Sequence, residues 1–166
     1  MNQSMSVLTS QATVEWYTPP TIIDRAWSVL GAIDLDPASA DMPQTWINAQ
    51  TYYTATTLLQ APWAGRVWLN PPFDDVPAWI ERLEREYAHG AVTAALLLVN
   101  SAPGYVWYED LWRRWPVVCL RERLRFIQAD GTPAGQAKKA QTIAYLGHDV
   151  RRFIDVFHDL GRIFLP

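Results

Sequence analysis

The sequence lacks several features that define common classes of protein. Its 166 residues include a single cysteine, Cys119, so an internal disulfide is excluded, and no cluster of cysteine and histidine has zinc-ligand spacing. No apolar run reaches the length of about 18 residues that a transmembrane helix needs, and no secretory signal pattern is present. We therefore expect a cytoplasmic protein with no metal site and no membrane association.

Basic charge is also scarce over the chain as a whole, since the net charge is -3. A protein that holds nucleic acid by charge alone carries an excess of lysine and arginine. The basic residues nevertheless gather in the second half, which holds Arg113, Arg114, Arg121, Arg123, Arg125, Lys138 and Lys139. This distribution predicts a local basic face.

Length and composition predict one folded domain. Apolar residues make up 49% of the chain and charged residues 19%, which is typical of a globular protein rather than a disordered one. We expect residues 1–14 to be a loose polar segment and residues 15–166 to form a single domain, because no repeat or low-complexity linker divides them.

Strand-like and helix-like segments alternate along the chain. Strand-like length and β-branched or aromatic content are found at residues 32–36, 66–69, 92–99, 116–120, 142–146 and 162–165. Helical patterns are found at 75–88, 104–115 and 149–160, and Thr18 can cap a further helix over 19–30 that ends at Gly31. This order predicts an α/β sandwich with a mostly parallel central sheet, whose ligand site lies beyond the carboxyl ends of the strands.

Asn70, Pro71, Pro72 and Phe73 directly follow the predicted strand at 66–69. The prolines remove backbone donors and hold the chain extended, which leaves carbonyl oxygens to accept hydrogen bonds. The Asn70 side-chain oxygen and a proline carbonyl oxygen can together accept both hydrogens of an NH2 group, while Phe73 stacks on the ring that carries it. The motif thus suits adenine N6, cytosine N4 or a glutamine amide. The alternative is a structural turn with Phe73 packed in the core.

Other motifs agree with this interpretation in their order and spacing. The sequence resembles the Dam-like DNA N6-adenine methyltransferases of phages and prophages in the stretches EWYTPPTIIDRAW, IDLDPAS, NAQTYYT, PWAGRVWLNPPF, TAALLLVNSAPGYVWYEDLW, RERLRFI and GQAKKAQTIAYLG. The likeness runs from about residue 15 to about residue 146. It implies a compact, Rossmann-like methyltransferase domain that uses S-adenosylmethionine, with Asn70, Pro71, Pro72 and Phe73 as the catalytic motif.

The resemblance also implies cofactor contacts in the first third of the chain. Thr18 and Pro19 match the element that holds the methionine end of the cofactor, Asp36 and Pro37 match the strand end that receives it, and Asn70 borders the same site. The start of a helix attracts a carboxylate, and an acid at a strand end can meet an ammonium group. An aspartate before proline is also an ordinary turn residue, so the residue types alone leave both interpretations open.

Trp16 and Tyr17 precede these residues and have two interpretations. They either cover the adenine ring of the cofactor or fill the core, as aromatic residues commonly do. A glycine-rich cofactor loop is missing, since DPASADM stands where many cofactor loops have glycines.

The same resemblance implies DNA as the partner. A base stacked in a duplex cannot reach the Asn70 motif, so the target base must be flipped out or single-stranded. The seven basic residues between Arg113 and Lys139 are the candidates for holding phosphates, and their alternative is a solvated rim whose stems pack on the core. The chain has Glu122 beside Arg123 where the family usually has glycine.

Three classes of function remain open. The first is a DNA adenine methyltransferase, and the second is an amino-methyltransferase that acts on cytosine N4 or on a protein glutamine amide. The third is a non-enzymatic module that keeps the fold to bind nucleic acid or a partner. We expect a monomer or a homodimer.

Overall fold

The computed structural model describes residues 16–54 and 61–166, so the expected loose segment at 1–14 lies outside the described residues. The helices are α1 (Pro20–Leu30), α2 (Gln44–Ile47), α3 (Val76–Ala88), α4 (Val106–Arg114) and α5 (Val150–Phe157). The strands are β1 (Leu35–Asp36), β2 (Thr51–Tyr52), β3 (Gly65–Leu69), β4 (Val92–Asn100), β5 (Val117–Leu120), β6 (Gln141–Leu146) and β7 (Gly161–Phe164).

The strands form one seven-stranded sheet with the order β2-β1-β3-β4-β6-β5-β7. Neighbours from β2 to β4 are parallel, whereas β6 runs antiparallel to both β4 and β5, and β7 runs antiparallel to β5. The fold is therefore mixed α/β, and the expected parallel arrangement is found at one end of the sheet only. The other end is antiparallel because residues 121–140, between β5 and β6, form no helix and return to the edge that they left.

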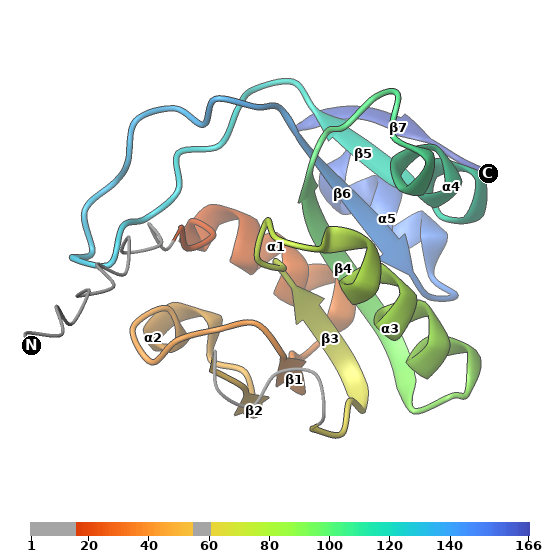
Figure 1. Ribbon diagram of the computed structural model, residues 1–166, viewed down its shortest axis with the longest axis horizontal. Coiled ribbons are helices and arrows are strands. Elements are labelled where there is room, and N and C mark those ends of the chain that lie inside the picture. The colour runs from red at the N-terminus through yellow and green to blue at the C-terminus, as the bar shows by residue number, and fades with distance from the viewer. Residues whose placement is uncertain (1–15, 55–60) are drawn as a thin grey trace, which may run out of the picture.

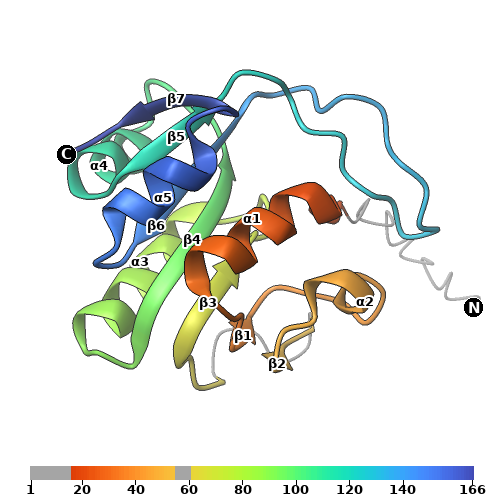
Figure 2. The ribbon, with the colours of Figure 1, turned by 180° about the vertical axis from the view of Figure 1, so that it is seen from behind.

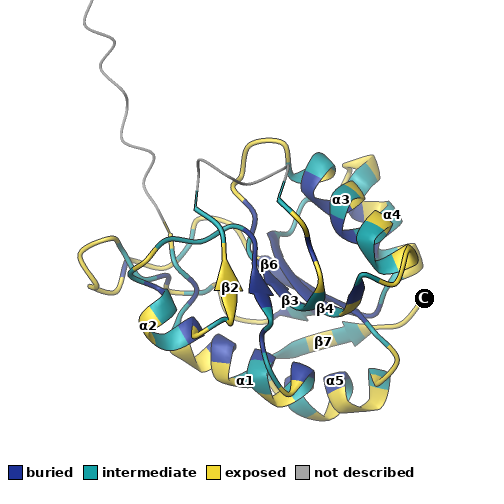
Figure 3. Cartoon of the chain, turned by 90° about the horizontal axis from the view of Figure 1, so that it is seen from below, coloured by how far each residue is buried: buried dark blue, intermediate teal, exposed yellow. Residues whose placement is uncertain are grey.

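Side chains of the central strands alternate between two hydrophobic cores. Along β4, Leu96 and Leu98 join the core under α1 and α5, whereas Leu97 and Val99 join the core under α3 and α4. Figure 3 shows the buried strands between these two pairs of helices, and Figure 2 shows the face that α1 and α5 cover. Because both faces are covered, these strands are continuous apolar runs instead of alternating apolar and polar residues.

Most predicted elements are confirmed, with ends shifted by a few residues. Two short elements, α2 and β2, were not predicted, because segments of four and two residues are too short to show periodicity. The first helix begins at Pro20, one residue later than predicted, with Pro19 at its N-cap position. No side chain caps this helix, so the predicted capping role of Thr18 is wrong.

Parallel neighbours bring the carboxyl ends of β1, β3 and β4 to one edge of the sheet. The same edge carries the segment 121–140, which we call the arm. Figure 1 shows the arm extending from β5 and β6 to the start of α1. None of the described helices is long and apolar enough to cross a membrane.

Candidate active site

Asp36 and the Asn70 loop lie side by side at this edge of the sheet. Leu35 of β1 pairs with Val67 of β3, so the Asn70 loop begins two residues beyond the level of Asp36 on the neighbouring strand. Asp36 is the last residue of β1, and Asn70 directly follows β3. The strand order therefore brings the predicted catalytic motif to the predicted cofactor acid.

The Asn70 side chain is oriented by the segment that precedes α1. Its Nδ2 atom donates a hydrogen bond of 3.4 Å to the carbonyl oxygen of Trp16. Within residues 16–54 and 61–166, no donor reaches Asn70 Oδ1 or the carbonyl oxygen of Pro71. Two acceptors thus remain at the loop for the two hydrogens of an amino group.

Phe73 does not pack in the core. Its side chain is 52% exposed, although the strand residues that lead into the loop are buried. The part of the structural-turn interpretation that packs Phe73 in the core is therefore wrong, and the ring is available to a flat partner.

Asp36 is a buried carboxylate, with only 2% of its surface exposed. Oδ2 accepts a hydrogen bond of 2.9 Å from Gln44 Nε2, and Oδ1 accepts a longer one of 3.4 Å from the Ala38 amide. No lysine, arginine or histidine in the described part of the chain forms an ion pair with it. Burial raises the pKa of Asp36 to about 6, because the charged form loses its hydration. A cationic group at this position would compensate for that loss.

Asp34, two residues earlier, has a different environment. Both of its oxygens accept hydrogen bonds from the Arg66 guanidinium, at 2.8 and 2.9 Å. This bidentate contact holds the pKa of Asp34 below its ordinary value. Of these two acids, Asp36 is therefore the one that has no cationic partner among the described residues.

Thr18 and the short helix α2 complete the wall around Asp36. Thr18 is 2% exposed, and its Oγ1 atom has no hydrogen-bond partner among the described residues. Its carbonyl oxygen accepts a hydrogen bond of 3.0 Å from Trp46 Nε1. Gln44 and Trp46 both belong to α2, so sequence reasoning missed them together with this helix. Pro37, which follows Asp36, is buried at the same strand end.

Trp16 and Tyr17 connect the Asn70 loop to the arm. Trp16 is 36% exposed, so the interpretation as core filling does not hold for this residue. The main chain of Tyr17 pairs with Ile127 of the arm through hydrogen bonds of 2.9 and 2.8 Å. The two residues thus join segments that lie more than a hundred positions apart in the sequence.

A comparison with models of protein families identifies the family of this chain. A family model described as DNA N-6-adenine-methyltransferase (Dam) matches residues 5–159. The chain belongs to the Dam family. Membership confirms the resemblance drawn from the sequence and supports DNA adenine N6-methylation as the general activity. Neither the search of curated proteins nor the search of solved structures found a match.

The arm of this Dam-family chain is an irregular hairpin whose two sides are joined by a few backbone hydrogen bonds. Ala137 donates to the carbonyl oxygen of Leu124 at 2.9 Å, and Ala134 donates to that of Phe126 at 2.7 Å. Phe126 is buried in the core under α1, which fixes the hairpin to the domain. The arm is therefore ordered by backbone pairing at its edges and by apolar contact at its base.

The side-chain amide of Gln141 forms hydrogen bonds at the base of the arm. Its side chain is 1% exposed, and Oε1 accepts a hydrogen bond of 2.9 Å from the Leu124 amide. Its Nε2 atom donates to the carbonyl oxygen of Lys139 at 2.5 Å and to Asn100 Oδ1 at 3.4 Å. One amide thus joins both sides of the arm to the end of β4.

Gln141→Leu is expected to loosen the arm. The substitution leaves the amide of the partly buried Leu124 without its partner, and a buried unsatisfied group costs about 1–3 kcal/mol. The free energy of unfolding in urea should fall, and trypsin should cut the folded protein at the arm's arginines and lysines sooner. Gln136→Leu, at an exposed arm position, is the control and should behave as the parent does. Equal trypsin resistance in all three proteins would show that Gln141 does not hold the arm.

The seven predicted phosphate-binding residues fall into two groups. Arg121, Arg123, Arg125, Lys138 and Lys139 lie on the arm, which has five basic residues and two acidic ones. Arg113 and Arg114 instead end α4, a helix that runs back from this edge of the sheet. Arg113 pairs with Asp110 at 3.4 Å and Arg114 with Glu84 at 3.1 Å. The structure thus brings the arm residues together and leaves the α4 pair apart from them.

The described residues contain no group of three or more histidine, cysteine, aspartate and glutamate side chains that could hold a metal ion.

Proposed function

We propose that this chain transfers a methyl group from S-adenosylmethionine to the N6 atom of an adenine in DNA, on a Rossmann-like methyltransferase sandwich. The observation that carries the proposal is the pair of open acceptors, Asn70 Oδ1 and Pro71 O, at the same sheet edge as the buried carboxylate of Asp36. Family membership supplies the substrate class.

Asn70 and Pro71 bind the amino group of the target base. An exocyclic amine offers two hydrogens, and two acceptor oxygens at one loop match them. Phe73, exposed beside these acceptors, stacks on the purine ring, and Pro72 fixes its distance from Asn70. A base inside a duplex cannot enter, so the target is either single-stranded or flipped out of the helix at a cost of a few kcal/mol.

The residues around Asp36 fit the amino-acid end of the cofactor. The buried carboxylate has no cationic partner in the described residues, and an ammonium group would supply one. The unpartnered Thr18 Oγ1 is a buried polar atom that a carboxylate or hydroxyl of the cofactor would satisfy. Pro19 and Pro37 shape the same wall, and Trp16 and Tyr17 lie between it and the arm.

The chain's own contribution to the reaction is to hold and activate N6. S-adenosylmethionine supplies a methyl group on a positively charged sulfur, which makes that methyl group electrophilic. By accepting both N6 hydrogens, Asn70 and Pro71 favour a tetrahedral nitrogen whose lone pair points at the methyl carbon. S-adenosylmethionine would supply the methyl group and leave as the neutral thioether, and the proton that N6 has to lose would pass through the Asn70 and Pro71 acceptors to water. Asp74 and Asp75 are exposed and need not act as bases.

The basic residues supply the hold on DNA. The arm residues Arg121, Arg123, Arg125, Lys138 and Lys139 lie at the edge of the sheet that carries Asn70, whereas Arg113 and Arg114 are ion-paired on α4. We accordingly assign the main phosphate contacts to the arm and secondary contacts to α4.

The test is to incubate the protein with labelled S-adenosylmethionine and unmethylated genomic DNA, then identify the nucleosides by mass spectrometry. N6-methyladenine is the expected product. N4-methylcytosine would move the assignment to the other exocyclic amine, and no methylated base in the presence of cofactor binding would point to a protein amide. Lack of cofactor binding would favour the non-enzymatic module.

Phe73→Ala is expected to weaken the use of DNA without unfolding the protein. Stacking on one base is worth about 1–3 kcal/mol, so kcat/KM for DNA should fall by roughly 5-fold to 150-fold. The melting temperature should stay near that of the parent, because the side chain is already 52% exposed. Phe73→Trp should keep most of the activity, whereas Phe73→Leu should resemble Phe73→Ala. Full activity of Phe73→Leu would rule out stacking as the role of the ring.

A further inference from the structure

A cavity of about 480 Å³ lies between the arm and the start of α1. Its wall comes from four segments: the first turn of α1, both sides of the arm and the turn after α5. The residues that matter here are Thr21, Arg121, Arg123, Arg125, Gln136 and Asp159. Neither Asn70 nor Asp36 lines this cavity, so it is separate from the site proposed for the base and the cofactor.

Three arginines form a row along the cavity. Arg121, Arg123 and Arg125 are alternate residues of the first segment of the arm, which bends at 121–122 and belongs to no strand, and all three line the cavity. All three are exposed to solvent, whereas Leu124 and Phe126 pack against the core under α1. The cavity thus has three exposed guanidinium groups beside side chains that pack into the core.

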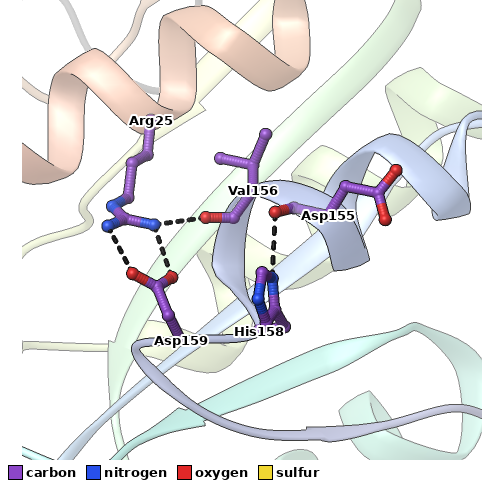
Figure 4. Close-up of polar contacts among 5 residues, drawn as sticks. All are labelled: Arg25, Asp155, Val156, His158 and Asp159. Atoms are coloured by element: carbon purple, nitrogen blue, oxygen red, sulfur yellow. Dashed lines mark hydrogen bonds and ion pairs between the residues drawn. The ribbon is translucent and has the colours of Figure 1, made fainter.

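One of the two acids that line the cavity, Asp159, is already paired with an arginine. Arg25 of α1 binds both oxygens of Asp159, at 2.7 and 2.8 Å, and also donates to the carbonyl oxygen of Val156 (Figure 4). This contact keeps the pKa of Asp159 below its ordinary value, so the carboxylate stays ionised and paired. His158, next to it, turns its Nδ1 atom to the Asp155 carbonyl oxygen, 3.0 Å away, on the same helix end.

The arginine row itself has no such partner. No ion pair joins Arg121, Arg123 or Arg125 to a carboxylate within the described residues. Arg123 Nη1 donates to the carbonyl oxygen of Lys138, which leaves its charge uncompensated. Glu122 is the one further acid on the cavity wall. The cavity is therefore basic and suited to an anion.

We propose that this cavity and the arginine row bind successive backbone phosphates of the DNA strand that carries the target base. Three separate cations that line one cavity fit a polymer of phosphodiesters better than a single small anion. The arm is joined to the Asn70 loop through Tyr17 and Trp16, so a strand held along the arm is positioned relative to the catalytic loop. The proposal rests on the proposed function, and it identifies which basic residues hold the strand.

The first test removes the three charges together. The variant Arg121→Ala, Arg123→Ala, Arg125→Ala and the parent are titrated with a fluorescent duplex oligonucleotide, without cofactor, between 50 and 200 mM salt. The slope of the logarithm of the binding constant against the logarithm of the salt concentration falls in magnitude by about 0.9 for each lost phosphate contact. Three lost contacts should therefore reduce this salt slope by about 2.7. At the low-salt end we expect binding to weaken by at least about tenfold.

A matched control has the same net charge. Arg85→Ala, Arg151→Ala, Arg162→Ala removes three exposed arginines that do not line the cavity, and its affinity and slope should stay close to those of the parent. Equal losses in the two triple variants would overturn the proposal, because overall charge alone would explain them. The proposal also fails if the arm variant keeps the parent's slope, or if the parent binds neither the duplex nor the same oligonucleotide as a single strand.

A gain-of-affinity variant guards against misfolding as an explanation. Glu122→Gln removes the remaining acid of the cavity and should tighten DNA binding several-fold, which a damaged protein would not do. Unchanged or weaker binding would count against the site. Cofactor affinity should be the same in all variants, and its loss in the arm variant would reassign the cavity to the cofactor.

The binding assay separates this inference from the proposed function. If the parent forms no N6-methyladenine but the arm variant still lowers the salt slope, the phosphate site stands and the catalytic proposal fails. If N6-methyladenine forms and the slope is unchanged, the catalytic proposal stands and the phosphate site fails.

Discussion

Asn70→Ala is expected to lower kcat for DNA methylation by at least about 100-fold to 1,000-fold, the effect of removing one acceptor or donor that acts on the reacting atoms. The substitution removes Oδ1, so N6 keeps only the Pro71 carbonyl oxygen and loses both its orientation and its tetrahedral bias. Cofactor affinity should change little, because the Asp36 wall remains intact. Methylated nucleosides measured by mass spectrometry under single-turnover conditions report the chemical step directly.

Asp74→Asn is the matched control for this experiment. Asp74 is exposed and lies four positions beyond Asn70 in the same loop, so the substitution changes a polar side chain without touching the acceptors. Its activity should stay within about threefold of the parent, since no general base is needed at this position. Loss of activity in Asp74→Asn with normal activity in Asn70→Ala would reverse the assignment of roles within the loop.

Asp36→Asn is expected to have two opposite effects. Cofactor affinity should fall by about 100-fold or more, because the substitution removes the charge that faces the ammonium group. The free energy of unfolding of the cofactor-free protein should rise at pH 8. Calorimetric titration with S-adenosylmethionine measures the first effect, and urea denaturation without cofactor measures the second.

The sign of the stability effect follows from the raised pKa. Burial raises the pKa of Asp36 in the folded protein to about 6, above the ordinary 3.8. The folded state therefore binds more protons than the unfolded state between these pH values, and stability falls as the pH rises through them. Above pH 6 the cost of the ionised group reaches about 3 kcal/mol for a shift of this size, and asparagine removes it.

Asp34→Asn is the control on the same strand and should have the opposite sign. Asp34 has a lowered pKa because Arg66 binds it, so its loss should reduce the free energy of unfolding and leave cofactor affinity unchanged. Cofactor binding to the parent should weaken as the pH falls below about 6, whereas the residual binding of Asp36→Asn should be independent of pH there. Equal pH profiles for the parent and Asp36→Asn would show that Asp36 does not meet the cofactor.

Local sequence patterns predicted most of the fold. Continuous apolar runs such as 92–99 predicted buried strands, and Gly31 ended the first helix as expected, with a left-handed φ of 75°. The patterns did not predict α2 and β2, because segments of this length are too short to show a hydrophobic periodicity. They also predicted more parallel pairing than exists, because alternation of strands and helices does not reveal that the chain between β5 and β6 forms a hairpin arm.

The sequence by itself predicted that the Asn70 loop is rich in hydrogen-bond acceptors. Two prolines after an apolar strand produce acceptor-rich extended backbone wherever that strand lies, since proline acts on its own residue and the one before it. The residue-level resemblance to the Dam family depended on the same short motifs, and the family match confirms it.

Only the tertiary structure decided which residues lie beside that loop. The neighbourhood of Asp36 and Asn70 depends on the pairing of β1 with β3, and the environment of Asp36 depends on Gln44 of the unpredicted α2. The split between the α4 and arm arginines depends on carboxylates far away in sequence, such as Glu84 beside Arg114. Burial, pairing and charge compensation arise from contacts between distant segments, whereas the patterns in a sequence record preferences that act over only a few residues.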